Sequence, residues 1–77
     1  MKNGIRDARL YHGMSQREIA RNVGISSAAM SAIERGEHIP SAVTAILIAR
    51  ELRTTVERLW GEAADEVTRE LYRKGVM

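Results

Sequence analysis

Helix start and stop signals, closely spaced along all 77 residues, constrain the fold of this chain more than any other feature of its sequence. The run Ser15-Gln16-Arg17-Glu18 is a capping box, in which the serine and glutamate side chains each pair with a backbone amide that a helix start leaves free. Gly24 and Gly36 follow helical apolar patterns, where a residue with positive φ typically ends a helix. No stretch alternates with the period of two that is typical of a strand. The sequence therefore predicts an all-α fold.

Six short helices account for the chain, with connections of a few residues between them. Their approximate predicted ranges are 3–11, 16–23, 27–35, 41–52, 56–60 and 62–74. Gly61 is expected to end the fifth of these helices and Gly75 the sixth. We expect residues 1–61 to form one helical domain, and residues 62–77 to add a C-terminal helix that dimerises or covers the core. A chain of this size buries only about 60% of the surface that it exposes when unfolded, so it has no room for a deep substrate cavity.

Composition excludes several classes of protein. The chain has no Cys, so disulfide scaffolds, thiolate catalysis and Cys-based metal sites are ruled out. His12 and His38 are too far apart in sequence for a metal motif, and we expect neither a metal nor a cofactor. No apolar run approaches the ~20 residues of a membrane span. Because the sequence also has no pattern typical of a catalytic site, we expect a cytoplasmic protein that is not an enzyme and does not bind membranes.

The distribution of charge points weakly to nucleic acid. The net charge is only +2, from 12 Lys and Arg against 10 Asp and Glu. Residues 1–60 carry nine basic and six acidic side chains, whereas residues 61–77 carry three basic and four acidic ones. The basic excess therefore lies in the predicted domain, and the C-terminal segment is expected to have a different role.

Residues 16–35 have the pattern of a helix-turn-helix, with two helices of about eight residues joined through Gly24. Ala20 lies where the two helices approach most closely, since a larger side chain would force them apart. The apolar residues expected to face inward are Ile19, Val23, Ile25, Met30 and Ile33. The outward face of the second helix has only small residues, namely Ser27, Ala28, Ser31 and Ala32. Such a face is expected where another surface approaches the helix closely.

Over residues 3–60 the chain resembles the phage-repressor-like (Xre/Cro-type) family of helix-turn-helix regulators. The matching segments are Ile5-Arg6-Asp7-Ala8-Arg9, Gly13-Met14-Ser15-Gln16, Glu18-Ile19-Ala20, Val23-Gly24-Ile25-Ser26, Met30-Ser31-Ala32-Ile33-Glu34-Arg35-Gly36, Pro40-Ser41 and Thr55-Val56-Glu57-Arg58-Leu59. The resemblance implies a five-helix, repressor-like domain whose third helix enters the major groove of double-stranded DNA. It also implies binding as a two-fold homodimer, with half-sites about one helical turn apart.

The resemblance assigns roles to individual residues. The base-reading positions match Ser27, Ala28 and Ala32, with Ser31 beside them. Gln16 matches a position that contacts the DNA backbone and buttresses the third helix, and Arg35 and Glu37-His38 match the backbone-contacting loop after that helix. With Arg17 added, we expect contacts to the DNA backbone from Gln16, Arg17, Arg35 and His38. Arg9 and Glu34 match a structural ion pair between the first and third helices. Base readers in this family are often Gln, Arg, Asn or Lys, so serine and alanine here predict few hydrogen bonds to base edges.

The fourth predicted helix is apolar almost all round. One face, formed by Ala45, Ile48, Ala49 and Leu52, is expected to complete the core. Another face carries Val43 and Leu47 and needs a cover of its own. The C-terminal segment offers one, because Trp60, Ala64, Val67 and Leu71 form a single apolar stripe. This cover is expected either within one chain or between the two subunits of a homodimer.

Two functions from different classes remain open. The first is a sequence-specific DNA-binding transcriptional regulator that occupies an operator as a homodimer. The alternative is a protein-interaction module on the same fold, such as an antitoxin or anti-repressor, in which DNA binding is secondary. That module would use the apolar face of the fourth helix and the C-terminal segment to bind a protein partner.

Overall fold

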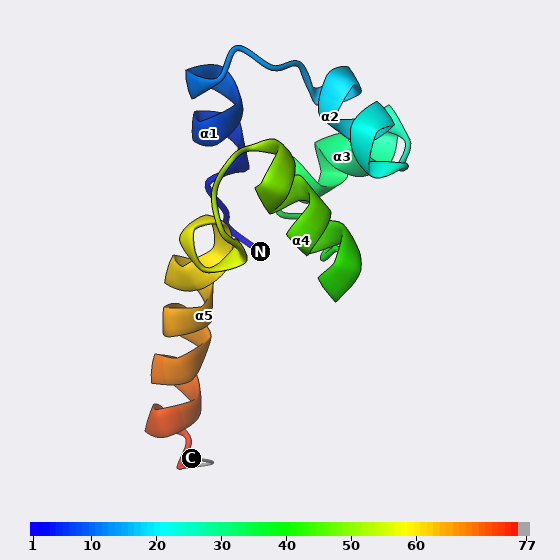
Figure 1. Ribbon diagram of the computed structural model, residues 1–77. Helices are drawn as coiled ribbons and strands as arrows, with labels where there is room; N and C mark the ends of the chain where they lie inside the picture. The colour runs from blue at the N-terminus through cyan, green and yellow to red at the C-terminus, as the bar shows by residue number, and fades with distance from the viewer. Residues whose placement is uncertain (76–77) are drawn as a thin grey trace.

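The computed structural model describes residues 1–75 and contains five helices and no strand in that range (Figure 1). The helices are α1 (Ile5–Tyr11), α2 (Gln16–Val23), α3 (Ser27–Glu34), α4 (Ala42–Glu51) and α5 (Val56–Arg73). The all-α prediction is confirmed. Residues 76 and 77, at the end of the predicted C-terminal segment 62–77, lie outside the described residues. Within residues 1–75, none of the helices has both the length and the apolar character that crossing a membrane requires.

Four of the five helices begin at a capping side chain, as the start signals predict. The N-cap oxygen accepts a hydrogen bond from the backbone amide three residues later at each of Ser15, Ser26, Ser41 and Thr55. At α2 the capping box is complete, because the Glu18 carboxylate accepts in turn from the Ser15 amide. Each such cap stabilises its helix by about 1 kcal/mol, which matters in a domain this small.

The predicted break at Gly61 is wrong, because α5 continues across this residue without interruption. Gly61 does not adopt the positive φ of a helix-ending glycine. A glycine inside a helix costs about 1 kcal/mol relative to alanine. Here the cost is outweighed by packing on either side, since Trp60 and Ala63 are only 9% and 5% exposed. The predicted sixth helix is therefore the second half of α5.

All five helices contribute to one core. Its buried residues are Ile5, Ile19, Ala20, Val23, Met30, Ile33, Ala45, Ile48, Ala49, Leu52, Leu59 and Trp60. α2 packs against both α3 and α4, and α4 packs against α5. The predicted inner face of α4 is buried in this core, together with all the predicted inward-facing residues of α2 and α3. Ile25, in the turn between α2 and α3, is half-buried against it.

The C-terminal half of α5 extends away from the other helices, which gives the molecule an elongated outline of 42 × 21 × 19 Å (Figure 1). Of the two forms left open for the cover of Val43 and Leu47 by Val67 and Leu71, the one within a single chain is absent from the described part of the structure. Val43 is 67% exposed and Val67 is 47% exposed, because the uninterrupted helix carries the tail away from the domain. Leu47 is instead half-buried against its own core, and Trp60 is part of that core.

Candidate nucleic-acid interface

The turn between α2 and α3 fixes how these two helices cross. Gly24 has a φ of 79°, in the left-handed region, and the Ile25 amide donates to the Ala20 carbonyl over 3.0 Å. Ala20 is 2% exposed, so its small methyl group is buried where α2 packs against α3. Ser26 then caps α3 by accepting a bond from the Ala29 amide over 3.0 Å. Residues 24–26 therefore form the turn of a helix-turn-helix.

The outward face of α3 is small and accessible. Ser27 and Ala28 are exposed, while Ser31 and Ala32 are half-buried. The opposite face holds Met30 and Ile33 in the core, at 0% and 2% exposure. Serine can donate or accept a hydrogen bond on this face, whereas alanine offers only a methyl group. A second surface can therefore approach the backbone of α3 closely.

Glu34, the last residue of α3, joins three helices. Its carboxylate accepts two hydrogen bonds from Arg9 of α1, from Nη2 to Oε1 over 2.9 Å and from Nε to Oε2 over 3.1 Å. Glu34 Oε2 also accepts from Nε2 of Gln16, the first residue of α2, over 2.9 Å. The Arg9 and Glu34 side chains are only 16% and 7% exposed. These two residues thus form a partly buried ion pair at the C-terminal end of α3.

The surroundings of Glu34 keep its carboxylate ionised. Burial acts to raise the pKa of Glu34, but the hydrogen bonds from Arg9 and Gln16 outweigh it and hold the pKa below its ordinary value. Arg9 Nη1 also donates to the Met14 carbonyl over 3.2 Å, which adds the connection between α1 and α2 to the network. The network therefore holds α3 in one orientation relative to α1 and α2.

The four residues expected at the DNA backbone lie at the start of α2 and just after α3. Gln16 and Arg17 begin α2, Arg35 is the C-cap of α3, and His38 follows in the next loop. The side chains of Arg17, Arg35 and His38 are exposed, and Gln16 is half-buried. Because Gln16 bonds to Glu34, the structure brings Gln16 to the same end of α3 as Arg35.

Asn3 is a positioning residue that the sequence reasoning missed. Its Nδ2 donates to the Ile33 carbonyl in the last turn of α3 over 2.9 Å, and its Oδ1 accepts from the Ile5 amide over 3.0 Å. The helix α1 begins at Ile5, with Gly4 as its N-cap, rather than at residue 3 as predicted. An asparagine just before an apolar helical pattern is a known start signal and could have revealed the bond to Ile5. The bond to α3 has no such signal, because it joins residues 30 positions apart.

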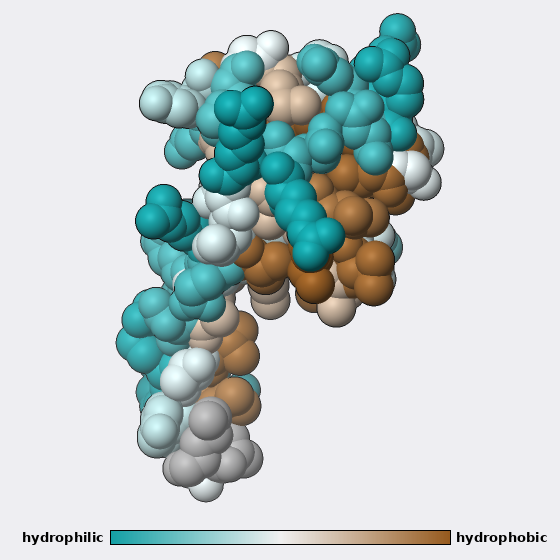
Figure 2. Space-filling model, in the orientation of Figure 1, coloured by the Kyte–Doolittle hydropathy of each residue, from teal (hydrophilic) through white to brown (hydrophobic). Residues whose placement is uncertain are grey.

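A separate apolar surface is shared by α4, α5 and the loop before α4, and is called here the α4–α5 apolar surface. Its exposed large side chains are Ile39 (64%), Val43 (67%), Ile46 (43%), Val56 (37%) and Val67 (47%). Figure 2 shows it spreading over α4 and continuing along one side of α5. A small apolar hollow within it is lined by Met1, Ile39, Pro40, Ala45, Val56 and Trp60.

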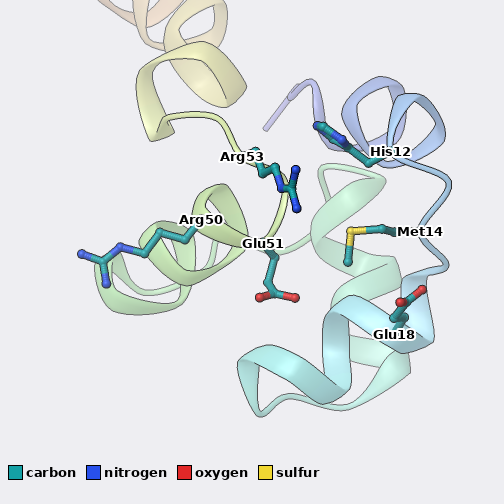
Figure 3. A pocket seen from close by; sticks show the side chains of 6 residues that line it. All are labelled: His12, Met14, Glu18, Arg50, Glu51 and Arg53. Atoms are coloured by element: carbon teal, nitrogen blue, oxygen red, sulfur yellow. The ribbon is translucent and has the colours of Figure 1, made fainter.

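A polar hollow of about 470 Å³ lies between the connection after α1 and the end of α4 (Figure 3). Its lining residues are His12, Met14, Glu18, Arg50, Glu51 and Arg53. The carboxylate of Glu18 belongs to the capping box of α2, and Glu51 accepts a bond from Asn22 over 2.6 Å. Arg50 points away from the other labelled side chains in Figure 3. The polar groups of this hollow therefore do not converge on one point, as an effector site would require.

Comparison with known families matches residues 5–59 to the helix-turn-helix family. YgzD of Bacillus subtilis, an uncharacterised HTH-type transcriptional regulator, is 32% identical over 57 residues, which cover 74% of this chain and 86% of YgzD. An uncharacterised HTH-type transcriptional regulator of Methanocaldococcus jannaschii is 32% identical over 66 residues, which cover 86% of this chain and 100% of the relative.

Two solved structures have the same arrangement of helices. The clp gene regulator ClgR from Corynebacterium glutamicum superimposes with a TM-score of 0.71 at 24% identity, covering 94% of this chain and 77% of ClgR; this likeness concerns the fold alone. SinR, solved in complex with SinI, superimposes with a TM-score of 0.69 at 25% identity, covering 95% of this chain and 79% of the other.

Proposed function

Since the chain belongs to the phage-repressor-like (Xre/Cro-type) helix-turn-helix family, we propose that it is a sequence-specific DNA-binding transcriptional regulator and not an enzyme. In this proposal α3 enters the major groove, as the second helix of a helix-turn-helix does. The observation that carries it is the outward face of α3, which is small and accessible, on a helix whose C-terminal end is held by the bonds of Glu34 to Arg9 and Gln16. A regulator of this kind acts in the cytoplasm, because that is where bacterial and archaeal cells, like those of its relatives, keep their DNA.

The base edges are read by Ser27, Ala28, Ser31 and Ala32. Alanine methyl groups pack against thymine methyl groups, and serine hydroxyls donate or accept one hydrogen bond at either kind of base pair. Side chains this short let α3 lie close to the groove floor. We therefore expect a site rich in A·T pairs, with part of its specificity coming from DNA shape at positions that the protein does not touch.

The DNA backbone is bound by Gln16, Arg17, Arg35 and His38. Contacts of this kind position the protein on DNA without specifying a sequence. With roughly three charge contacts per protomer, a dimer should show a slope of log affinity against log salt of about −5, from ~0.9 per neutralised phosphate.

A homodimer is part of the proposal, because one α3 reads only a few base pairs and two copies double that footprint. The α4–α5 apolar surface supplies its interface. Trp60, Val67 and Leu71 share one side of α5 at helical spacing, and α5 carries this stripe beyond its own domain. In the dimer, Val67 and Leu71 of one protomer cover Val43 and Leu47 of the other. A standard interface buries about 800 Å² per partner, which is roughly a seventh of the 5327 Å² that one protomer exposes.

The dimer interface is tested with Val67→Glu and its matched control Thr68→Glu. Both variants place the same charge at neighbouring exposed positions of α5, but only Val67 belongs to the apolar stripe. Light scattering should find Val67→Glu monomeric at concentrations where the wild type and Thr68→Glu are dimeric. Equal dimerisation of all three proteins would remove α5 from the interface.

The second candidate function is the protein-interaction module. Two observations favour it: the extent of the exposed α4–α5 apolar surface, and the presence of SinI bound to SinR in one of the similar solved structures. In that case the apolar surface binds a different protein, and the serine and alanine face of α3 has lost most of its part in DNA recognition.

DNA binding by the wild type at low salt separates the two functions. Genomic fragments retained by the purified protein supply the binding site, and Ala28→Lys is then compared with Thr68→Lys, which adds the same charge on α5. Ala28→Lys should lower the affinity for the retained fragments about tenfold or more, because it places a long side chain where α3 meets the bases. Thr68→Lys should leave the affinity nearly unchanged. A wild-type protein that retains no fragments would favour the protein-interaction module.

A further inference from the structure

Arg35, expected at a DNA phosphate, is already engaged within the protein. Its Nε donates to Oε2 of Glu37 over 2.7 Å, and its Nη2 donates to Oε1 of the same carboxylate over 3.2 Å. The remaining nitrogen, Nη1, donates to the Ser31 hydroxyl. All three nitrogens of the guanidinium therefore have partners, and the group is held against the outward face of α3.

The backbone after α3 places Glu37 beside Arg35. Gly36 takes a φ of 80°, its amide donates to the Ile33 carbonyl over 3.0 Å, and the Glu37 amide donates to the Ala32 carbonyl over 2.9 Å. This turn brings the Glu37 carboxylate back alongside the residue two positions earlier. Because these backbone hydrogen bonds form the turn, a substitution of the Glu37 side chain leaves them in place.

The ion pair cancels a positive charge where DNA is expected. The hydrogen bond and charge of Arg35 lower the pKa of Glu37, and the same interaction raises the pKa of Arg35, so both groups are charged near neutral pH. Their side chains are 54% and 61% exposed. Ion pairs this exposed to water are weak. A phosphate can therefore displace the carboxylate, but it must compete with it.

We propose that Glu37 competes with DNA phosphate for Arg35 and thereby limits the affinity of the protein for DNA of any sequence. The inference rests on the proposed function, since it needs the outward face of α3 against DNA. In the free protein, Glu37 and Ser31 hold Arg35 on that face. On DNA, a phosphate replaces the carboxylate, and the Ser31 hydroxyl becomes free for a base edge. The displaced carboxylate then lies near the phosphates and repels them, so DNA that offers few other contacts is bound weakly.

The experiment measures binding of the full chain to a labelled duplex of random sequence, by fluorescence anisotropy over a range of salt concentrations. Glu37→Gln is compared with Glu66→Gln, which removes the same charge from the exposed polar side of α5. Glu37→Gln should bind about fivefold more tightly per protomer, as expected for a weak exposed pair. Its slope of log affinity against log salt should be steeper by up to ~0.9 per protomer, because the displaced carboxylate no longer offsets the charge that Arg35 brings to the phosphates. Glu66→Gln should stay within about twofold of the wild type, since its charge is remote from α3.

The double variant Arg35→Gln with Glu37→Gln tests whether the gain depends on Arg35. Its affinity should return to the wild-type value or fall below it. A gain that is equal in Glu37→Gln and Glu66→Gln, or one that survives in the double variant, would overturn the competition. If neither the wild type nor Glu37→Gln binds the duplex at low salt, the proposed function is refuted. The competition for Arg35 is then refuted as well. Thermal melting of each variant checks that it is folded.

Discussion

Replacing Arg9 alone should lower the free energy of unfolding by about 3 kcal/mol, the low end of the range for breaking a buried ion pair. The low end applies because the pair is not fully buried: 16% of the Arg9 side chain and 7% of the Glu34 side chain remain exposed. The substitution removes two hydrogen bonds to Glu34 and one to the Met14 carbonyl, and it leaves the carboxylate with only the bond from Gln16. Replacing both partners with apolar residues removes the buried charge as well, so it should cost much less.

The assay is urea unfolding, followed by circular dichroism at one fixed protein concentration, of Arg9→Met, Glu34→Leu and the double variant. Equal slopes against urea make the free energies comparable. The summed cost of the single substitutions should exceed the cost of the double by roughly 2 kcal/mol. Arg17→Met, at an exposed position of α2, is the control and should change stability by less than about 0.5 kcal/mol. Single costs below about 1 kcal/mol that simply add would show that Arg9 and Glu34 behave as an exposed pair and that neither charge is buried.

Three further predictions concern stability. The pKa of Glu34 is lower in the folded protein than the ordinary value of 4.5, so its ionised carboxylate stabilises the fold above that pH. This stability is lost as the pH falls through the lower folded pKa. Glu34→Gln should therefore flatten the acidic part of a plot of melting temperature against pH, and an unchanged plot would mean that Glu34 contributes no such stability. Asn3→Ala should cost about 1–2 kcal/mol in urea unfolding, because the Ile5 amide loses its acceptor and the Ile33 carbonyl loses its donor. Wild-type stability would mean that water replaces both bonds. Gly61→Ala should raise the free energy of unfolding by up to ~1 kcal/mol, since the added Cβ meets only the flexible end of Glu57, at 3.0 Å; a destabilised variant would show that α5 needs a glycine there.

The helix starts could be predicted from the sequence because a cap is a local interaction. Ser15 needs only the amide three residues later, and the same holds for Ser26. Gly61 could not be interpreted in this way. A glycine ends a helix or lies inside one according to what its neighbours pack against, and the burial of Trp60 and Ala63 depends on the rest of the fold. The direction of the α5 tail follows from that same uninterrupted helix.

Some features of the candidate site could likewise be predicted from local sequence, whereas others could not. Helical periodicity places Ser27, Ala28, Ser31 and Ala32 on one face of α3, opposite its buried residues, and the exposures agree with that placement. Interactions that depend on the path of the chain could not be found so easily. The bond from Asn3 to α3 joins distant residues, and Glu37 reaches Arg35 only because the turn at Gly36 directs it back.

Selection of bound sequences from a random duplex pool, with the wild type and Ala28→Lys in parallel, tests most directly the claim that α3 reads DNA. The wild type should enrich an A·T-rich site with two-fold symmetry and half-sites about one helical turn apart. Ala28→Lys should enrich a site of the same symmetry and spacing that differs at one position in each half, because only one pair of base contacts has changed. If both proteins select the same motif, or a folded wild type selects none, α3 does not read the bases.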